Sequence, residues 1–285
     1  MFLESCFSQD FLYSNVYSLT IQATGWKNRL AEESYYSMDF ICHNLFKDEN
    51  SDLKDSIHKE FPKTCAPDDF FGQVKRTING KPVPQEQIDM IVAAINSGLE
   101  LSSQDILLDI GCGNGALSQY LFEKCEGFLG VDFSSYLVEI AKTNFEQLPR
   151  YEFLLLDAAA YVSLESNPER FSKALCYGVF SYFSPTVAET VLTVLAQRFT
   201  GVERLFIGNL PDPERAHRFF PEGKDFRGLL DERDSPLGIW RSMDIMGDLA
   251  ERTGWKAEFQ NMPEEFYASH YRFDAILTRQ AAKQS

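Results

Sequence analysis

The sequence predicts a doubly wound α/β fold built on a seven-stranded, mostly parallel sheet. Short apolar runs alternate with helical segments through the middle of the chain. Strands that alternate with helices form parallel sheets covered on both faces. The runs also recur at the spacing of right-handed βαβ units, and two further apolar runs close the chain.

Five apolar runs are the expected parallel strands, and the segments between them have helical spacing. The strands are expected at 106–111, 128–132, 151–157, 173–178 and 204–210, and two of the helices at 134–148 and 185–199. A helix at 239–254 is expected to end at Gly254. WKAEFQ and RFDAILTR then predict two closing strands, one of them a terminal antiparallel strand.

The remaining segments divide the chain. Residues 82–99 predict a helix that precedes the sheet. We expect residues 1–70 to form a helical cap or lid, and residues 71–285 to form the main domain. Within that domain, the Pro- and charge-rich stretch 211–238 predicts an inserted loop.

Composition restricts the possible partners. The 285 residues carry a formal net charge of −15, which repels phosphate backbones, so nucleic acid is not an expected partner. The six cysteines form no C-x-x-C pair, and no apolar run is long enough to span a membrane. These features predict a soluble cytoplasmic protein with reduced thiols, and a homodimer is one possible state.

A glycine-rich turn follows the first strand and is expected to lead into a helix. It contains Asp109, Gly111 and Gly113, and glycines let the backbone turn tightly and approach a ligand. The pattern also satisfies the dinucleotide fingerprint G-x-G-x-x-G/A, with Asp132 at the distance where an acid accepts both ribose hydroxyls. The turn alone therefore leaves a nicotinamide cofactor and a methyl donor both open.

Three observations favour the methyl donor. Asp109 lies inside the strand end, where it would repel a pyrophosphate. The turn follows a helical segment rather than the start of the chain. Asp157 ends the third strand and could accept a hydrogen bond from an adenine amino group. Both Asp132 and Asp157 could instead cap the helices that follow them.

The motifs resemble those of class I, Rossmann-like S-adenosylmethionine-dependent methyltransferases. LLDIGCGNGALSQYL, GVDFS, LLLDAAAY and KALCYGVFSYFS are similar to the first four motifs of that family, and the resemblance covers roughly 80–280. It implies S-adenosyl-L-methionine as the cofactor. The implied binding residues are Asp109, Gly111, Cys112 and Gly113 around the methionine part, Asp132 and Phe133 at the ribose, Asp157 and Ala158 at the adenine, and Tyr177 and Gly178 beside the methyl group.

The acceptor side is less constrained by the sequence. His270 and Tyr182 are the candidate catalytic residues, because a hydroxyl acceptor must lose a proton. Candidate acceptor-binding residues are Arg76, His217, Tyr271 and Arg272. We expect His43 and His58 at the surface, and no metal.

The flanking segments resemble methyltransferases of surface-glycan and secondary-metabolite biosynthesis. These segments are 72–87, 207–215, 237–250 and 268–279. The resemblance implies a small-molecule acceptor, a polar metabolite, and O-methylation of a sugar or glycan precursor. Three alternatives stay open: N-methylation of a small amine, an NAD-dependent oxidoreductase, and a cofactor-binding subunit without catalysis.

Overall fold

The computed structural model describes residues 56–233, 235 and 237–280. Contacts along the chain separate residues 1–48 from residues 49–285, and the described residues all belong to the second unit. The expected cap at 1–70 therefore lies outside the described residues up to position 55, as does His43.

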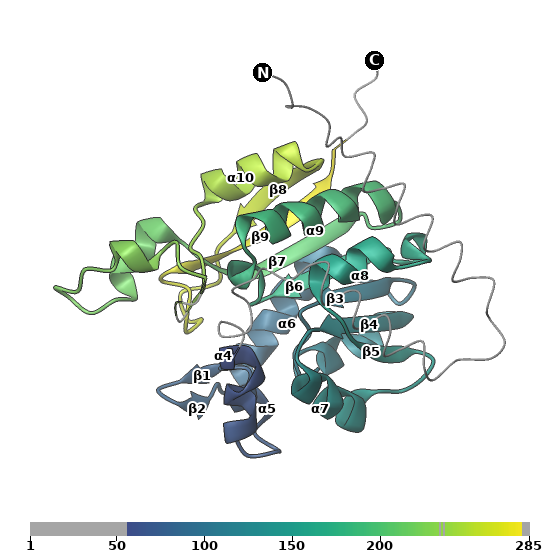
Figure 1. The fold of residues 1–285 in the computed structure, drawn as a ribbon, viewed down its shortest axis with the longest axis horizontal. Helices are drawn as coiled ribbons and strands as arrows, with labels where there is room; N and C mark the ends of the chain where they lie inside the picture. The colour runs from purple at the N-terminus through teal and green to yellow at the C-terminus, as the bar shows by residue number, and fades with distance from the viewer. Residues whose placement is uncertain (1–55, 234, 236, 281–285) are drawn as a thin grey trace, which may run out of the picture. The chain divides into compact units, whose positions relative to one another are not determined.

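A seven-stranded sheet forms the centre of the described unit, in the order β5-β4-β3-β6-β7-β9-β8 (Figure 1). The strands are β3 (Ile106–Ile110), β4 (Gly127–Asp132), β5 (Tyr151–Leu155), β6 (Lys173–Tyr177), β7 (Arg204–Pro211), β8 (Trp255–Gln260) and β9 (Arg272–Arg279). β3 to β7 are parallel, and β9 is antiparallel to both of its neighbours. The predicted seven-stranded, mostly parallel sheet is confirmed.

Helices cover both faces of this sheet. They are α6 (Gln85–Leu99), α7 (Ser135–Phe145), α8 (Ala158–Leu164), α9 (Pro185–Arg198) and α10 (Met243–Arg252). Successive side chains of a strand point to opposite faces, so Leu107 packs in one buried cluster with α6 and α7. Leu108 packs in the other cluster, with α8, α9 and α10. The sheet is therefore wound on both sides, as in a doubly wound fold.

Two helical predictions differ from the structure. The glycine turn leads into the 3₁₀ helix η2 (Ser118–Lys124) and not into an α-helix, with i→i+3 bonds such as Tyr120 N–H to Leu117 O at 3.2 Å. α10 begins at Met243 rather than near residue 239, because the Ser242 side chain accepts the Ile245 N–H and caps the first turn there. The expected loop 211–238 contains η5 (Pro213–Arg218) and η6 (Arg227–Leu229).

A short segment precedes α6 and consists of α4 (Ser56–Lys59), η1 (Phe61–Thr64), α5 (Phe70–Gln73) and the hairpin β1 (Thr77–Ile78) and β2 (Lys81–Pro82). Two more 3₁₀ turns flank β6: η3 (Pro168–Arg170) precedes it, and η4 (Phe180–Tyr182) follows it. Among the described residues, no helix has the length and apolar character needed to cross a membrane.

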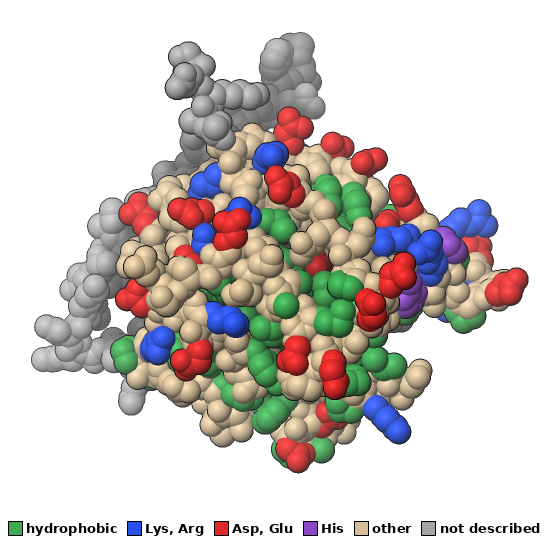
Figure 2. Space-filling view, turned by 180° about the vertical axis from the view of Figure 1, so that it is seen from behind, with side chains coloured by type: hydrophobic (Ala, Val, Ile, Leu, Met, Phe, Trp, Pro, Cys, Tyr) green, Lys and Arg blue, Asp and Glu red, His purple; other side chains and the backbone are tan. Residues whose placement is uncertain are grey.

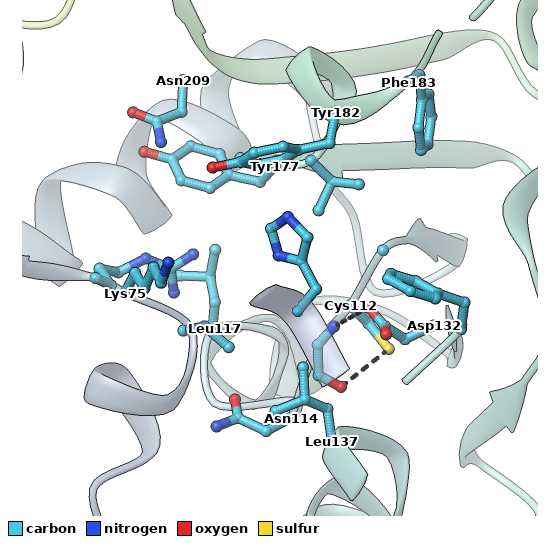
Figure 3. Close-up of a pocket in the computed structure, with 18 of the residues that line it drawn as sticks. Lys75, Cys112, Asn114, Leu117, Asp132, Leu137, Tyr177, Tyr182, Phe183 and Asn209 are labelled. Carbon is cyan, nitrogen blue, oxygen red and sulfur yellow. Dashed lines mark hydrogen bonds between the residues drawn. The ribbon is translucent and has the colours of Figure 1, made fainter. Parts of the chain in front are cut away.

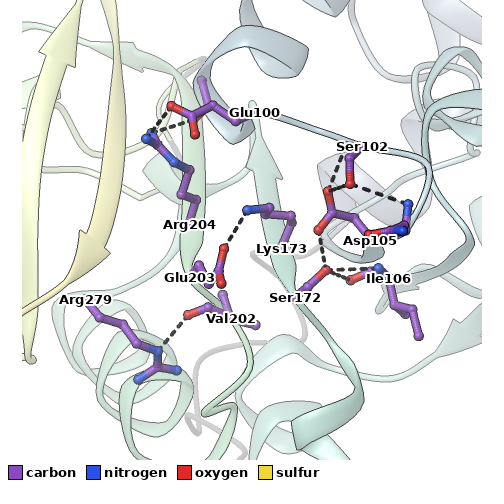
Figure 4. Close-up of polar contacts among 12 residues, drawn as sticks. Glu100, Ser102, Asp105, Ile106, Ser172, Lys173, Val202, Glu203, Arg204 and Arg279 are labelled. Carbon is purple, nitrogen blue, oxygen red and sulfur yellow. Dashed lines mark hydrogen bonds and ion pairs between the residues drawn. The ribbon is translucent and has the colours of Figure 1, made fainter.

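Polar contacts fasten the amino ends of the central strands (Figure 4). Ser172 Oγ donates to Asp105 Oδ1 at 2.7 Å and accepts from Ile106 N–H at 3.0 Å, which joins β3 to the start of β6. Lys173 Nζ pairs with Glu203 at 3.0 Å and joins β6 to the start of β7. The carboxyl ends lie at the opposite edge of the sheet, where a ligand site can form.

The strand order reverses between β3 and β6. The chain runs outward through β3, β4 and β5, and then returns to β6 on the other side of β3. Connections on the two sides of such a point leave in opposite directions and open a crevice at the carboxyl ends of the strands. The fold therefore predicts the position of the ligand site.

Candidate functional site

A pocket of about 360 Å³ lies at this crevice (Figure 3). The ends of β3, β4, β5, β6 and β7 all contribute residues to its lining. So does the segment His58–Thr77 that precedes α6. Pockets of this size are in the range that holds small molecules.

The glycine turn forms the floor of the pocket and depends on glycine. Gly111 and Gly113 have φ values of +77° and +58°, in the left-handed region that glycine adopts readily. A Cβ added to Gly111 would lie 2.6 Å from Val179 Cγ1. The turn therefore has room only for backbone, and it presents that backbone to the pocket.

Asp132 joins the end of β4 to the glycine turn. Its Oδ2 accepts the Gly113 N–H and its Oδ1 accepts the Ser134 N–H, each at 2.9 Å. Burial raises the pKa of this carboxyl to about 6. Each carboxylate oxygen has two lone pairs, so the structural bonds leave acceptor capacity for a ligand.

Asp109 is buried beneath the turn and still lines the pocket. Its Oδ2 accepts from Ser118 Oγ at 2.7 Å. Burial, and to a smaller extent the nearby Asp132, raises the pKa of Asp109 to about 7. A cationic group in the pocket would stabilise the charged carboxylate.

Asp157 caps α8, as one sequence interpretation allowed. Its Oδ1 accepts from Ala159 N–H at 2.8 Å and from Ala160 N–H at 3.2 Å. Both bonds use the same oxygen, and Asp157 and Ala158 also line the pocket. Capping and ligand binding are therefore compatible at this residue.

Aromatic and amide side chains form the wall on the β6–β7 side. Tyr177 and Gly178 come from the end of β6, Tyr182 from η4 and Asn209 from β7. The side chains of Tyr177, Tyr182 and Asn209 lie together in Figure 3. Burial raises the pKa values of Tyr177 and Tyr182 above their usual range. Both phenols are therefore neutral hydrogen-bonding groups at neutral pH.

The segment before α6 contributes Arg76 and an unexpected histidine. Arg76 lies between two rings, 5.8 Å from the centroid of Phe71 and 5.4 Å from that of Tyr177. His58 was expected at the surface, but the structure places it in the pocket lining. Its ring centroid is 4.4 Å from that of Tyr182. No spacing in the sequence links two residues so far apart, so this contact could come only from the fold.

The sequence candidates at the end of the chain separate into two groups. Tyr271 and Arg272 line the pocket, whereas His217 and His270 are exposed and lie outside its lining. In Figure 2 histidine is visible at the surface beside basic side chains. Burial and the charges of Arg218 and Arg272 lower the pKa of His270. The last connection turns Tyr271 inward, against Phe219, and His270 outward.

Of the cofactor residues implied by the motifs, all ten line this one pocket: Asp109, Gly111, Cys112, Gly113, Asp132, Phe133, Asp157, Ala158, Tyr177 and Gly178. Burial, followed by the charges of Asp132 and Asp109, raises the pKa of the Cys112 thiol well above its usual range, so it is not a thiolate nucleophile.

Among the described residues, no group of three His, Cys, Asp or Glu side chains is placed to hold a metal ion.

Comparison with known sequences finds similarity to methyltransferases. A family model described as a methyltransferase domain matches residues 108–198. An uncharacterized methyltransferase of Schizosaccharomyces pombe is 37% identical over 116 residues, which are 40% of this chain and 42% of the relative. A probable cobalt-precorrin-6B C(15)-methyltransferase of Methanocaldococcus jannaschii is 29% identical, over 29% of this chain and 41% of the relative. The matches thus span about two fifths of these curated relatives.

Comparison with solved structures supports the fold over a longer stretch. Magnesium protoporphyrin IX methyltransferase of Synechocystis PCC 6803, with S-adenosylmethionine bound, has a TM-score of 0.52 at 16% identity, over 82% of this chain and 98% of that one. An S-adenosylmethionine-dependent methyltransferase from Listeria monocytogenes, described as putative in that structure, has the same TM-score at 13% identity, over 70% of this chain and all of that one.

Proposed function

Since the chain carries a class I, Rossmann-like methyltransferase domain, we propose that it transfers the methyl group of S-adenosylmethionine to an oxygen of a small polar metabolite, such as a sugar or glycan precursor. The observation that carries the proposal is the convergence of Asp109, Asp132 and Asp157 on one pocket at the switch point of the sheet. We also propose that the protein acts in the cytoplasm, and that any homodimer leaves this pocket open.

The acids have distinct proposed roles toward the donor. Asp132 accepts the two ribose hydroxyls, because it stands at the end of β4 and keeps free lone pairs. Asp109 faces the cationic methionine part, where its charged form is stabilised. Asp157 accepts from the adenine amino group with the oxygen that does not cap α8.

The acceptor is proposed to enter beside Tyr177 and Tyr182. S-adenosylmethionine supplies a methyl group already activated by its sulfonium, so alignment of donor and acceptor accounts for much of the rate. A hydroxyl acceptor must also release a proton. His58, in contact with Tyr182, replaces His270 as the proposed base, because it lies in the pocket. Arg76, Tyr271 and Arg272 are the proposed acceptor ligands.

Two measurements test this function. Isothermal titration with S-adenosylhomocysteine and with NADH compares the two cofactor classes directly. Binding of S-adenosylhomocysteine alone supports the proposal, and binding of NADH alone contradicts it. Transfer of a labelled methyl group to a panel of sugars, polar hydroxy acids and amines then identifies the acceptor atom. Labelling of amines alone would replace O-methylation by N-methylation, and tight donor binding with no transfer to any class would favour the non-catalytic subunit.

His58→Ala tests the base once an acceptor is known. We expect kcat to fall by about 10²- to 10⁴-fold, the usual contribution of a positioned general base. Affinity for S-adenosylhomocysteine should stay the same. His270→Ala, which changes an exposed histidine outside the pocket, is the matched control and should leave kcat unchanged. The reverse pattern would return the role to His270.

A further inference from the structure

The charged side chains of the pocket are separated by sign. The acids that line it, Asp109, Asp132 and Asp157, all come from the ends of β3 and β4 or the residues after β5. The described lining residues from β6, β7, β9 and the segment before α6 include no carboxylate, and they do include Arg76 and Arg272. In a chain with a net charge of −15, this local excess of cations needs a specific explanation.

Arg272 is the first residue of β9 and pairs with Pro211, so it stands at the carboxyl end of β7. Its Nη1 donates to Asn209 O at 3.2 Å, and its guanidinium lies 4.9 Å from the ring centroid of Tyr271. Its Nε is buried and has no hydrogen-bond partner. Among the described residues, no carboxylate forms an ion pair with it.

Asp274, the nearest acid along the strand, forms no ion pair with Arg272, although the charge of Arg272 acts to lower its pKa. Asp274 accepts the Asn209 N–H with Oδ1 at 2.8 Å, and it is not part of the pocket lining. Burial raises its pKa to about 6. The guanidinium is therefore positioned by a backbone carbonyl and a ring, with part of its donor fork unused.

Arg76 is half-buried and differs from Arg272 in one respect, because its charge also acts on Asp109, whose pKa it lowers. Its guanidinium is held between Phe71 and Tyr177 by cation–π contacts, without an ion pair among the described residues. Burying a cation without an anion is unfavourable, and this applies to Arg272, whose Nε is buried without a partner. The planar fork of arginine matches the oxygens of a carboxylate or phosphate.

We infer that the acceptor carries an anionic group, a carboxylate or a phosphate, and that Arg272 binds this group beside the methyl-transfer site. The inference rests on the proposed function, because the site on the acid-lined side must hold the donor. It narrows the acceptor from a polar metabolite to an acidic one, such as a sugar acid or a sugar phosphate. Arg76 also lines the pocket, where it lies over the Tyr177 ring, and contributes a second positive charge.

The Nε–Hε resonance of Arg272 provides a direct test in the full-length protein saturated with S-adenosylhomocysteine. We expect inorganic phosphate or acetate to shift this resonance with saturation, at a Kd of about 1 mM or below. The resonance is assigned by its loss in Arg272→Lys. The anion with the lower Kd distinguishes a phosphate from a carboxylate. Acetamide, the neutral analogue of acetate, should cause no saturable shift.

Matched variants separate this inference from the function on which it rests. Isothermal titration should show anion binding at least tenfold weaker in Arg272→Gln, which lacks the Nε–Hε resonance, and an unchanged affinity for S-adenosylhomocysteine. Arg252→Gln, at an exposed pair with Glu189, should change neither. Absence of saturation with both anions, or equal binding to Arg272→Gln, would overturn the inference while donor binding still supports the function. A shift of Arg272 on addition of S-adenosylhomocysteine alone would assign this arginine to the donor and also overturn it.

Discussion

At the scale of single residues, the site depends on carboxylates whose protonation is altered by burial. Burial raises the pKa of Asp109 and of Asp132, the charge of Asp132 raises that of Asp109 further, and both side chains are nearly inaccessible to solvent. Hydrogen bonds from Ser118, Gly113 and Ser134 oppose the effect of burial. The result is a pair of acids that titrate near neutral pH, where a bound cation can change their state.

Asp132→Ala should lower the affinity for S-adenosylhomocysteine by at least about 100-fold, because hydrogen bonds to a charged group are each worth about 1.5–3 kcal/mol. Isothermal titration measures the loss. Asp225→Ala removes an exposed carboxylate far along the chain and is the control. Unchanged affinity in Asp132→Ala would remove this residue from the donor site.

Affinity for S-adenosylhomocysteine should increase as the pH rises toward 7. The pKa values of Asp109 and Asp132 are raised, to about 7 and about 6, so both bind protons in the free protein at mildly acidic pH. A donor that prefers the charged forms must displace these protons, and this cost disappears above pH 7. In Asp109→Asn the midpoint should move from about 7 to about 6. Titrations at a series of pH values would contradict this if the midpoint did not move.

At the scale of elements, the turn between β3 and η2 combines two constraints. Its backbone enters the left-handed region at Gly111 and Gly113, and Val179 from the β6–η4 connection packs against the first of them. The Asp132 carboxylate fixes the turn from the neighbouring strand. One short segment thus connects the ends of three strands.

Gly111→Ala should reduce the free energy of unfolding by about 2–4 kcal/mol, from an unfavourable φ and an overlap with Val179. Chemical denaturation measures the change. Gly228→Ala, where an added Cβ meets nothing within 4 Å, should stay within about 0.5 kcal/mol of the parent protein. The double variant with Val179→Ala should recover the part due to overlap. Equal free energies of unfolding for Gly111→Ala and Gly228→Ala would contradict this account of the turn.

The same scale explains what the sequence could predict. The strands were found because buried parallel strands are continuous apolar runs, and the glycine turn because its backbone requires glycine. The acids were placed correctly at strand ends because parallel strands end at one edge. The sequence did not identify His58 as a pocket residue, because its contact with Tyr182 joins two segments that are far apart along the chain. His270 was chosen because it belongs to a run of three polar residues. The sequence does not show which of these side chains point into the pocket, because only the connection to β9 determines their directions.

At the scale of the whole molecule, the two edges of the sheet have different roles. The amino ends are joined by contacts such as Ser172 with Asp105 and Lys173 with Glu203. The carboxyl ends carry the pocket and its separated charges. Acidic side chains are spread over the face seen in Figure 2 rather than gathered into one patch. The net charge of −15 therefore gives that surface no single binding region.

Donor binding should stabilise the whole described domain. At a concentration 100 times its Kd, S-adenosylhomocysteine should add about 2.7 kcal/mol. For a domain of roughly 150–250 residues this raises Tm by about 5–10 °C. A thermal unfolding series with S-adenosylhomocysteine and NADH makes the comparison under one set of conditions. A rise with NADH alone would contradict the methyltransferase assignment of the site.

The separation of charge across the pocket has a consequence for protein engineering. The proposed donor residues Asp109 and Asp132 lie on β3 and β4, whereas the pocket residue Asn209 and the proposed acceptor ligand Arg272 lie on β7 and β9. A mutant library confined to the ends of β7 and β9 would vary acceptor choice while each member kept its cofactor. Variants selected from such a library could then be ranked on new substrates without rebuilding the half of the pocket that supplies the methyl group.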